Sequence, residues 1–582
     1  MSPSLDRLPG LPGDPLFKTL LYNAQHIHST LIRDTSAGIA ATPAQFLRDV
    51  IFFKHRINTQ LATSGIDVHT VAGDVDVYIC ILAPLSYEFL VAFYAVIALG
   101  GVAVPLSTSI LPEEGAWILN KCRASCLLVG TNQGELASQI RSEQQPGLDV
   151  PIELTPPDSF PPLPSAATGD SFNPNGPGLV LFTSGTTGPP KGVVLPRNFF
   201  FPNVELDCES HDIALVYRPV NGLSGILNLM DLIYVGACAE LFPGGIQPAI
   251  IWERLRQGGV TVLAGATRFW QLLMLHYEEN LSRLPSSDLQ QYREGAYNLR
   301  VAWFGGGLPS PVARRFWLQL RTGKSWIVKY GSSETGREAF SFRFRGEEEI
   351  AKPVIGTPLP GVTAKLSEGD HGELLLKSPT MMIGLVRVQR PSSHLIHCDD
   401  RYLDDEQRTR ETFDEDGYYK TGDLVHRESS GLWIIDGRAT VDFVRFNGLR
   451  VSVNEVESHV CELPYIGEAY VLCIPDLQYG QRVGCLVRCR NKTSDLDSRE
   501  ISLERLRGDL SDTLSVYKLP SILRVLETDA KLPTSPQGKL ARSQTIKMYF
   551  LDDTQSSCLE VWPLDAEDLR PKKAWDWGGV AA

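Results

Sequence analysis

The chain has 582 residues, of which 43% are hydrophobic and 21% charged, a composition typical of globular proteins rather than of disordered or collagen-like ones. Its 55 Lys and Arg against 68 Asp and Glu give a net charge of −13, which repels phosphate backbones and argues against nucleic acid as a partner. The 11 cysteines contain no CxxC pair and predict buried free thiols rather than a zinc site. No secretory or peroxisomal signal is recognisable, so a cytoplasmic protein is expected.

The most apolar region, Val75 to Leu106, is not expected to span a membrane. Its only unbroken apolar stretch, Phe89 to Leu99, is too short for a bilayer core of about 30 Å. We predict instead a buried strand at Val77 to Ala83, followed by a core helix from about Tyr87.

From about residue 75 to residue 335, short apolar runs alternate with segments of helical length. Strands are expected at Gly178 to Phe182, Val260 to Leu263, Leu299 to Trp303 and Trp326 to Val328. This alternation predicts βαβ units and a largely parallel sheet. Shorter strands from about residue 350 predict a smaller β-rich unit.

A new α/β pattern begins past about residue 440. It predicts a helix at Val453 to Glu462, strands near Ala469 to Ile474 and Gly484 to Cys489, and a last helix at Ser502 to Leu514. The final residues are acidic and contain Trp562, Trp575 and Trp577. Composition leaves open whether this tail docks on the body or is a loose appendage.

The segment Thr183 to Gly192 combines a run of Thr, Ser and Gly with two prolines and Lys191, directly after a predicted strand. Backbone N–H groups and hydroxyls of such a loop can surround phosphate oxygens, and the lysine adds positive charge. It is not a Walker A loop, because Gly192 stands where Ser or Thr is needed for Mg²⁺. We therefore predict a polyphosphate-binding loop rather than a flexible surface turn.

Two further segments supply what a nucleotide site also needs. Tyr330 to Glu334 offers an aromatic ring for a base, hydroxyls for phosphate and a carboxylate for Mg²⁺. Asp423 can accept from ribose hydroxyls, and Arg438 can reach the same sugar or a phosphate. Each residue alone would be an ordinary turn residue, so the prediction depends on the set.

The ordered set of motifs resembles the adenylate-forming enzymes, a superfamily of acyl-CoA synthetases, adenylation domains of nonribosomal peptide synthetases and luciferases. The resemblance runs from about residue 75 to about residue 546, and the residues of the motifs are most similar to those of the coumarate-CoA ligase and malonyl-CoA synthetase branch. The matching segments are Thr183 to Gly192, Tyr330 to Glu334, Tyr419 to Asp423, Gly437 to Glu457 and Pro533 to Arg542.

The resemblance implies an α/β fold with a large N-terminal α/β region that includes a small β unit, and a smaller, mobile C-terminal α/β domain. The expected divisions are an AMP-binding domain at 1–441, a C-terminal domain at 442–546 and a tail at 547–582. It implies an acid–thiol ligase that uses ATP, Mg²⁺ and coenzyme A and has a small-molecule carboxylic acid as substrate. The acid first displaces pyrophosphate to give acyl-AMP, and the thiol then displaces AMP.

The resemblance also assigns roles to residues. Catalytic positions are Lys539, Glu334, Ser333 and Lys191, with Glu334 on Mg²⁺. Nucleotide contacts are expected from Thr183, Ser184, Gly185, Thr186, Thr187, Gly188, Lys191, Gly305, Gly306, Gly307, Tyr330, Ser333, Asp423, Arg438 and Lys539. Asp442 is the expected hinge, and Arg445 and Gly448 are expected in the coenzyme A channel.

The chain departs from the family at the acyl pocket, for which Asn221, Phe269 and Lys329 are the candidates. Where most relatives carry an aromatic residue followed by His, this chain has Tyr217-Arg218. Lys329 stands where malonyl-CoA synthetases have a basic residue. It could pair with a second substrate carboxylate, but we favour an exposed lysine at a strand end, because single basic residues there are usually solvated.

Two alternatives stay open. The chain could load a carrier protein in trans, or an amine, in place of coenzyme A, or it could be a degenerate homologue without activity. The sequence retains all the charged residues expected in the site, which argues against a loss of activity. They are Lys191, Glu334, Asp423, Arg438 and Lys539.

Overall fold

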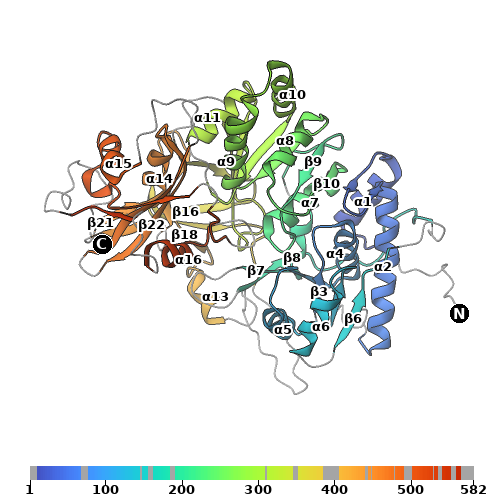
Figure 1. Ribbon diagram of the computed structural model, residues 1–582. Coiled ribbons are helices and arrows are strands. Elements are labelled where there is room, and N and C mark those ends of the chain that lie inside the picture. The colour runs from blue at the N-terminus through green and yellow to red at the C-terminus, as the bar shows by residue number, and fades with distance from the viewer. Residues whose placement is uncertain are drawn as a thin grey trace.

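A computed structural model describes residues 10–66, 76–143, 147–154, 162–183, 191–202, 204–307, 311–344, 352–383, 406–438, 443–446, 449–476, 479–490, 501–527, 530–534, 540–551 and 559–564. Within these ranges the strands form three sheets. Figure 1 shows the N-terminal elements, blue to green, at one end of the molecule and the C-terminal elements, orange to red, at the other.

The first sheet has the strand order β6-β5-β3-β4-β7-β8, parallel except for β8. Its strands are β3 (Tyr78–Leu82), β4 (Val102–Leu106), β5 (Cys126–Val129), β6 (Leu148–Pro151), β7 (Pro177–Thr183) and β8 (Lys191–Pro196). The nearby helices are α1 (Pro15–His26), α2 (Pro43–Thr63), α4 (Tyr87–Leu99), α5 (Pro112–Lys121) and α6 (Gly134–Ser142), followed by the short η3 (Arg197–Phe200). Every residue of α4 except Glu88 is buried, which confirms the predicted core helix.

The second sheet joins the parallel strands to the predicted small β unit. Its order is β16-β17-β18-β19-β15-β14-β13-β12-β11-β9-β10-β1-β2. The strands are β1 (Ile32–Asp34), β2 (Ile39–Ala41), β9 (Ile213–Val216), β10 (Cys238–Leu241), β11 (Val262–Gly265), β12 (Val301–Gly305), β13 (Trp326–Tyr330), β14 (Phe340–Phe344), β15 (Val354–Pro358), β16 (Thr363–Glu368), β17 (His371–Lys377), β18 (Tyr419–Arg427) and β19 (Trp433–Arg438). The β-rich unit is thus continuous with the large sheet through β14 and β15.

Strands β11, β12 and β13 were predicted from the sequence, and they run parallel to one another and to β9 and β10. Because side chains alternate along a strand, Trp303 points to one face of the sheet and Phe304 to the other. The Phe304 face packs on a cluster of indole rings from Trp252, Trp270, Trp317 and Trp326. The helices around this sheet are α7 (Leu223–Val235), α8 (Pro248–Arg256), α9 (Thr267–His276) continued by η4 (Tyr277–Leu281), α10 (Ser286–Tyr297), α11 (Pro311–Leu320) and α13 (Glu406–Thr412).

The third sheet belongs to the C-terminal unit. It contains β20 (Phe443–Phe446), β21 (Leu449–Ser452), β22 (Ile466–Asp476), β23 (Gly480–Cys489), β24 (Ile522–Leu526) and β25 (Leu559–Val561). The remaining elements are α14 (Val453–Glu462), η5 (Val516–Lys518), α15 (Leu503–Leu510), α16 (Arg542–Ile546) and η6 (Lys547–Leu551). Helix α14 has the predicted bounds, because Ser452 caps it by accepting from the N–H of Glu455 at 3.3 Å. Helix α15 ends four residues before the predicted Leu514.

The described part of the tail docks on this unit. Strand β25 pairs antiparallel with β24, and the guanidinium of Arg507 lies 4.5 Å from the ring centroid of Trp562. Arg482 donates to the carbonyl oxygen of Trp562. Residues 559–564 therefore pack on the C-terminal unit, and the predicted domain boundaries stay predictions. Trp575 and Trp577 lie outside the described residues.

Contacts join the C-terminal unit to the large one near the second sheet. Gln271 of α9 donates to the carbonyl oxygen of Gly467 at 3.1 Å, and Arg490 lies 3.5 Å from the carboxylate of Glu278. Ser452 donates to the carbonyl oxygen of Asp436 at 3.0 Å. The C-terminal unit thus contacts the helix that follows β11.

None of the helices in the described ranges is long and apolar enough to cross a bilayer. The cysteines in these ranges are free thiols, and six of the nine are buried.

Candidate active site

Polar residues follow four neighbouring parallel strands at their carboxyl ends. They are Arg218 after β9, Thr267 after β11, Gly306 and Gly307 after β12, and Ser332 to Glu334 after β13. Ligands of parallel α/β sheets bind at this edge, because the loops there converge above the strand ends. The structure thus brings together segments separated by more than a hundred residues.

Unsatisfied polar atoms mark the same edge. The Nη2 of Arg218, the Oγ1 of Thr267 and the Oγ of Ser332 are buried and have no hydrogen-bond partner. Leaving such atoms unpaired costs about 1–3 kcal/mol each, so proteins rarely keep them without a ligand or water. Such atoms also occur elsewhere in the protein, so these three support a ligand-binding surface only together with their position at the strand ends. The sequence put Ser332 among the hydroxyls expected near phosphate and Arg218 at the acyl pocket, but named none of the three as a site residue.

The glycine run at the end of β12 exposes backbone to this edge. Gly306 and Gly307 have φ values of +77° and +148°, which residues with a Cβ adopt only under strain. A Cβ on Gly307 would lie 3.0 Å from the Oγ1 of Thr267. The run can therefore approach a flat ligand closely, which suits the predicted adenine contact.

The turn that carries Ser333 and Glu334 is held by the buried hydroxyl of Thr335. This hydroxyl accepts from the N–H of Ser332 and donates to its carbonyl oxygen, both at 2.9 Å. The carbonyl oxygen of Glu334 accepts from the N–H of Met382 at 2.9 Å. With the backbone held in this way, both predicted side chains are presented from a fixed turn and are partly exposed.

Gly336 closes this turn, and replacing it with alanine is expected to disable the site. Its φ is +74°, and an added Cβ would lie 2.0 Å from the carbonyl oxygen of Thr380, so the backbone must shift. We expect a lower midpoint of thermal unfolding and loss of ATP turnover. Gly369→Ala is the matched control, because Gly369 has φ +70° with no atom within 4 Å and should cost only about 1–2 kcal/mol of backbone strain. Equal effects of the two variants would contradict the packing argument.

Tyr330 and Asp423, predicted as separate nucleotide contacts, are bonded to each other. The hydroxyl of Tyr330 donates to the carboxylate of Asp423, which is 4% exposed. Burial, and then the nearby carboxylate, raise the pKa of Tyr330 well above its usual range, so the phenol stays a donor. Arg438 is the residue paired with Asp423 across β18 and β19. This puts the two predicted ribose residues opposite each other on neighbouring strands.

The predicted phosphate loop connects β7 to β8. Thr183 and Lys191 are paired at its base. Its residues Ser184, Gly185, Thr186, Thr187 and Gly188 lie outside the described residues, as do Lys539, Asp442 and Gly448. For Arg438 and Arg445 the structure describes only the backbone. Their predicted roles stay predictions.

Of the acyl-pocket candidates, Phe269 has no exposed surface and stacks on Tyr217 with ring centroids 4.5 Å apart. Its predicted role in the pocket stays a prediction. Lys329 is not the exposed strand-end lysine that we favoured. Its side chain is 13% exposed and lies 3.3 Å from Asp207 and 3.2 Å from Glu338. Asn221 is partly exposed, just before Gly222, the N-cap of α7.

Neighbouring carboxylates keep the side chain of Lys329 positively charged. Burial alone would lower the pKa of Lys329, but the carboxylates of Glu338 and Asp207 outweigh it and raise the pKa above its usual range. The ammonium group therefore stays charged, with carboxylates of the protein as its partners.

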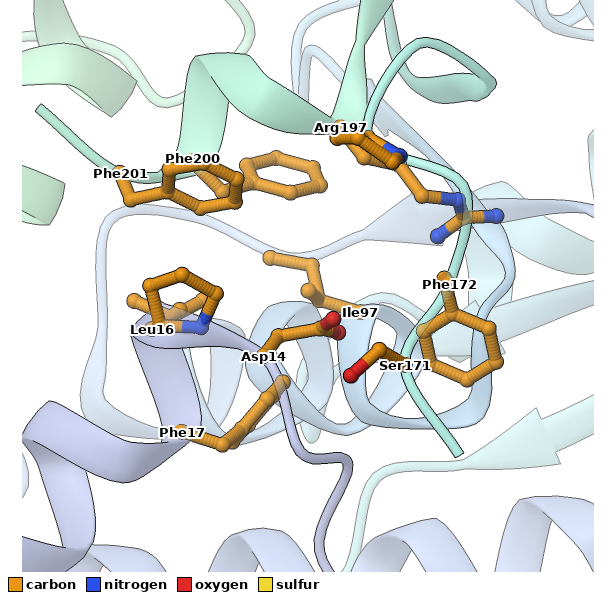
Figure 2. A pocket seen from close by; sticks show the side chains of 11 residues that line it. Asp14, Leu16, Phe17, Ile97, Ser171, Phe172, Arg197, Phe200 and Phe201 are labelled. Carbon is orange, nitrogen blue, oxygen red and sulfur yellow. The ribbon is translucent and has the colours of Figure 1, made fainter. Parts of the chain in front are cut away.

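A cavity of about 270 Å³ lies at the end of the first sheet that is opposite to the predicted phosphate loop. Figure 2 shows that Phe172, Phe200 and Phe201 surround it, together with Asp14 and Arg197. Arg197 follows the last residue of β8, which pairs with the first residue of β7, whereas the phosphate loop follows the last residue of β7. Since ligands of parallel sheets bind at the carboxyl ends, this cavity is not the nucleotide site.

Comparison with known proteins identifies the family of the chain. The model of a family described as AMP-binding enzyme matches residues 71–386. The chain belongs to this family. The predicted membership in the adenylate-forming superfamily is thereby confirmed. Among curated relatives, the AMP-binding protein is 33% identical over 548 residues to the acyl-CoA ligase OryP of Aspergillus oryzae, covering 93% of each chain. It is 29% identical over 502 residues to a malonate–CoA ligase of Arabidopsis thaliana, covering 80% of this chain and 77% of that one.

Solved structures of the family share the fold of this AMP-binding chain. ATP-bound MatB from Rhodopseudomonas palustris superposes with a TM-score of 0.70 at 20% identity, covering 92% of this chain and 99% of that one. The anthranilate CoA ligase AuaEII in complex with anthranoyl-AMP gives 0.71 at 20% identity, covering 91% and 97%. The predicted fold class is confirmed.

Proposed function

We propose that the chain is an ATP-dependent, AMP-forming acyl-CoA ligase that activates a carboxylic acid as its acyl-adenylate and transfers it to coenzyme A. The observation that carries the proposal is the edge at the ends of β9 to β13. There the unpaired polar atoms, the glycine run and the Glu334 turn meet, and Tyr330 of β13 links them to Asp423 of β18. Nearly full-length similarity to proteins named as CoA ligases supports this reading.

The first half-reaction joins two anions, a carboxylate and a phosphate, so its main need is neutralisation of charge. In our proposal Lys191 and the hydroxyls from Thr183 to Thr187 bind the outer phosphates, and Ser333 and Lys539 bind the α-phosphate. Gly305 to Gly307 line the adenine, and Asp423 with Arg438 holds the ribose. A phenol bonded to one carboxylate oxygen of Asp423 keeps the side chain oriented toward the sugar.

The residues present fit a magnesium ion bound mainly through the nucleotide. In the described ranges no group of three or more His, Cys, Asp or Glu could hold a metal by itself. Mg²⁺ bound with ATP commonly takes only one or two carboxylates from the protein, and Glu334 on its rigid turn can supply one. When bound, the ion neutralises charge on the phosphates.

For the second half-reaction we propose that the C-terminal domain moves about Asp442, taking Lys539 away and bringing Arg445 and Gly448 to the coenzyme A channel. The contacts from Gln271 to Gly467 and from Glu278 to Arg490 would then have to change. Both are polar, and the charges of Arg490 and Glu278 are partly exposed, so breaking them costs little.

Coenzyme A is favoured over the two alternatives. No observation here points to a carrier protein or an amine as the acceptor. A protein without activity would have no reason to keep buried polar atoms unpaired at this edge, because filling the space with apolar side chains would stabilise it.

The test is acid-dependent exchange of labelled pyrophosphate into ATP, followed by thioester formation. A panel of short, medium-chain, aromatic and dicarboxylic acids with hydroxylamine as trap should reveal at least one acid that supports exchange. Adding coenzyme A should then consume it with release of AMP. Absence of exchange with every acid would refute the enzyme, and exchange without consumption of coenzyme A would refute the acceptor.

A further inference from the structure

The segment 378–383, which we call the strap, links the first and second sheets beside the candidate active site. It directly follows β17 of the second sheet. The N–H of Ile383, its last residue, donates to the carbonyl oxygen of Val194 at 3.0 Å. Val194 is part of β8, the strand of the first sheet that begins at Lys191.

The strap also binds the turn that carries Glu334. The N–H of Met382 donates to the carbonyl oxygen of Glu334 at 2.9 Å, and the hydroxyl of Thr380 accepts from the N–H of Arg337 at 3.0 Å. The same hydroxyl can donate to the carbonyl oxygen of Thr335 at 3.4 Å. Thr380 is 2% exposed, so water cannot readily take its place in these bonds.

Two side chains strengthen the link between the sheets. The Nδ2 of Asn198 donates to the carbonyl oxygen of Pro379 in the strap at 2.9 Å. The guanidinium of Arg337, just after the Glu334 turn, donates to the carbonyl oxygen of Phe199 at 3.1 Å. Asn198 and Phe199 belong to η3, which directly follows β8. The turn after β13 is therefore tied to the first sheet both through the strap and through Arg337.

A nucleotide-bound magnesium ion would need this link. In the proposed function Lys191 of the first sheet binds the outer phosphates, and Glu334 of the second sheet supplies a carboxylate to the ion on the same phosphates. Mg²⁺ demands near-ideal octahedral geometry, and a misplacement of about 1 Å in an active site can cost about 100-fold in rate. The two sheets must therefore keep a fixed separation at this point.

Resting on the proposed function, we infer that Thr380 is a positioning residue for the nucleotide-bound magnesium ion, because its hydroxyl fixes the Glu334 turn to the strap and thereby to β8. Thr380 is buried, whereas the side chain of Glu334 is partly exposed and can reach a ligand. Thr380 thus acts through the backbone of the turn. Valine in its place would keep the shape of the side chain but leave the N–H of Arg337 without its acceptor.

The test measures how much Mg²⁺ strengthens the binding of ATP. Isothermal titration calorimetry gives the affinity of the protein for ATP with Mg²⁺ and with EDTA, and the ratio of the two is the magnesium effect. In Thr380→Val this effect should be about 10- to 100-fold smaller than in the wild type, the usual loss when a group that orients a metal ligand is removed. Thr380→Ser keeps the hydroxyl and should restore most of the effect.

Asn198→Ala is a second variant in case Thr380→Val does not fold. Asn198 is partly exposed, and its replacement cuts one bond to the strap next to Thr380 while leaving the turn intact. The magnesium effect should fall by about three- to tenfold, less than in Thr380→Val because the bond from Ile383 to Val194 remains. An unchanged magnesium effect in either variant would overturn the inference, as would a wild type that binds ATP equally well with Mg²⁺ and with EDTA.

A double-mutant cycle with Glu334→Gln separates positioning from general support of the fold. If Thr380 acts through Glu334, Thr380→Val should change the magnesium effect less than threefold once Glu334 has been replaced, because the two residues are then coupled. An equal loss in the presence and in the absence of the Glu334 carboxylate would show that Thr380 only stabilises the protein, and the inference would fail.

Thr261→Val is the matched control. The hydroxyl of Thr261 also accepts from a backbone N–H, that of Ile213 at 3.0 Å, and it donates to the carboxylate of Asp212 at 2.7 Å. Thr261 precedes the first residue of β11, at the edge of the sheet opposite to the site. Its replacement should lower the Tm but leave the magnesium effect unchanged, and an equal fall of that effect would contradict a role specific to Thr380.

Failure of the proposed function is a separate outcome of these experiments. If no acid supports pyrophosphate exchange, the proposed ligase activity fails. The magnesium effect on ATP binding still decides the role of Thr380, because its measurement needs neither an acid nor coenzyme A.

Discussion

Replacing Lys539 with alanine is expected to lower the rate of acyl-AMP formation by about 100- to 1,000-fold, the usual loss when one preorganised charge at a transition state is removed. Conversion of supplied acyl-AMP to the thioester should stay within about threefold of the wild type, because in the proposed mechanism the lysine has no role once pyrophosphate has left. Pyrophosphate exchange reports the first step, and thioester formation from synthetic acyl-AMP reports the second.

Lys531→Ala is the matched control for this experiment. Lys531 is an exposed lysine in the same part of the C-terminal domain, and neither step should change when it is replaced. A Lys539→Ala variant that loses both steps equally would contradict the proposed division of labour between two positions of the domain.

Arg337→Met is expected to destabilise the large unit by about 3–5 kcal/mol, because it leaves a buried charge without its partner. The Arg337 side chain is 4% exposed, pairs with Asp231 and donates to the carbonyl oxygen of Phe199 at 3.1 Å. Arg343→Met is the control, since Arg343 pairs with Asp207 while its side chain is 46% exposed, so it should cost about 0–1 kcal/mol. The midpoints of urea unfolding measure both changes.

The pH dependence of this loss has a definite sign. Burial raises the pKa of Asp231, and Arg337 acts against that rise. Without the guanidinium the pKa of Asp231 in the folded state rises further, so its protonated form, which is the favoured buried form, appears at higher pH. Unfolding releases this proton, which favours the unfolded state more and more as the pH rises above the ordinary pKa of an aspartate. The variant should therefore lose least relative to the wild type at about pH 5 and most at about pH 8. A gap that widens toward low pH would contradict this account.

Local sequence patterns were a good guide to the elements and to the edge where the site lies. The buried strand and the helix from Tyr87 to Leu99 were predicted from an apolar run, and α14 from its periodicity. These features depend on neighbours within a few residues, and the sequence displays them directly. The Glu334 turn was predicted from its place after a strand and the glycine run from the family resemblance, and the structure puts both at one sheet edge.

The sequence predicted less about how the β-rich unit and the tail pack on the rest of the protein. Strand β14 pairs with β15, and this pairing makes the β unit continuous with the large sheet. No local pattern in the sequence indicates that these two segments pair. Docking of Trp562 depends on Arg482 and Arg507, which lie more than fifty residues away in the chain. Neither could be inferred from composition.

By itself the sequence determined the family, the order of the nucleotide-binding motifs and the positions of several buried strands, because each depends on residue types at short spacings. Only the tertiary structure decided how the cations near the predicted acyl pocket are buried and paired. A lysine at a strand end looks solvated until Asp207 and Glu338 come from elsewhere in the chain to bury and pair it. Arg218 looks like a substitution for histidine until its unpaired nitrogen is found over Trp303. Burial and pairing are properties of neighbours in space, and these neighbours are remote along the chain.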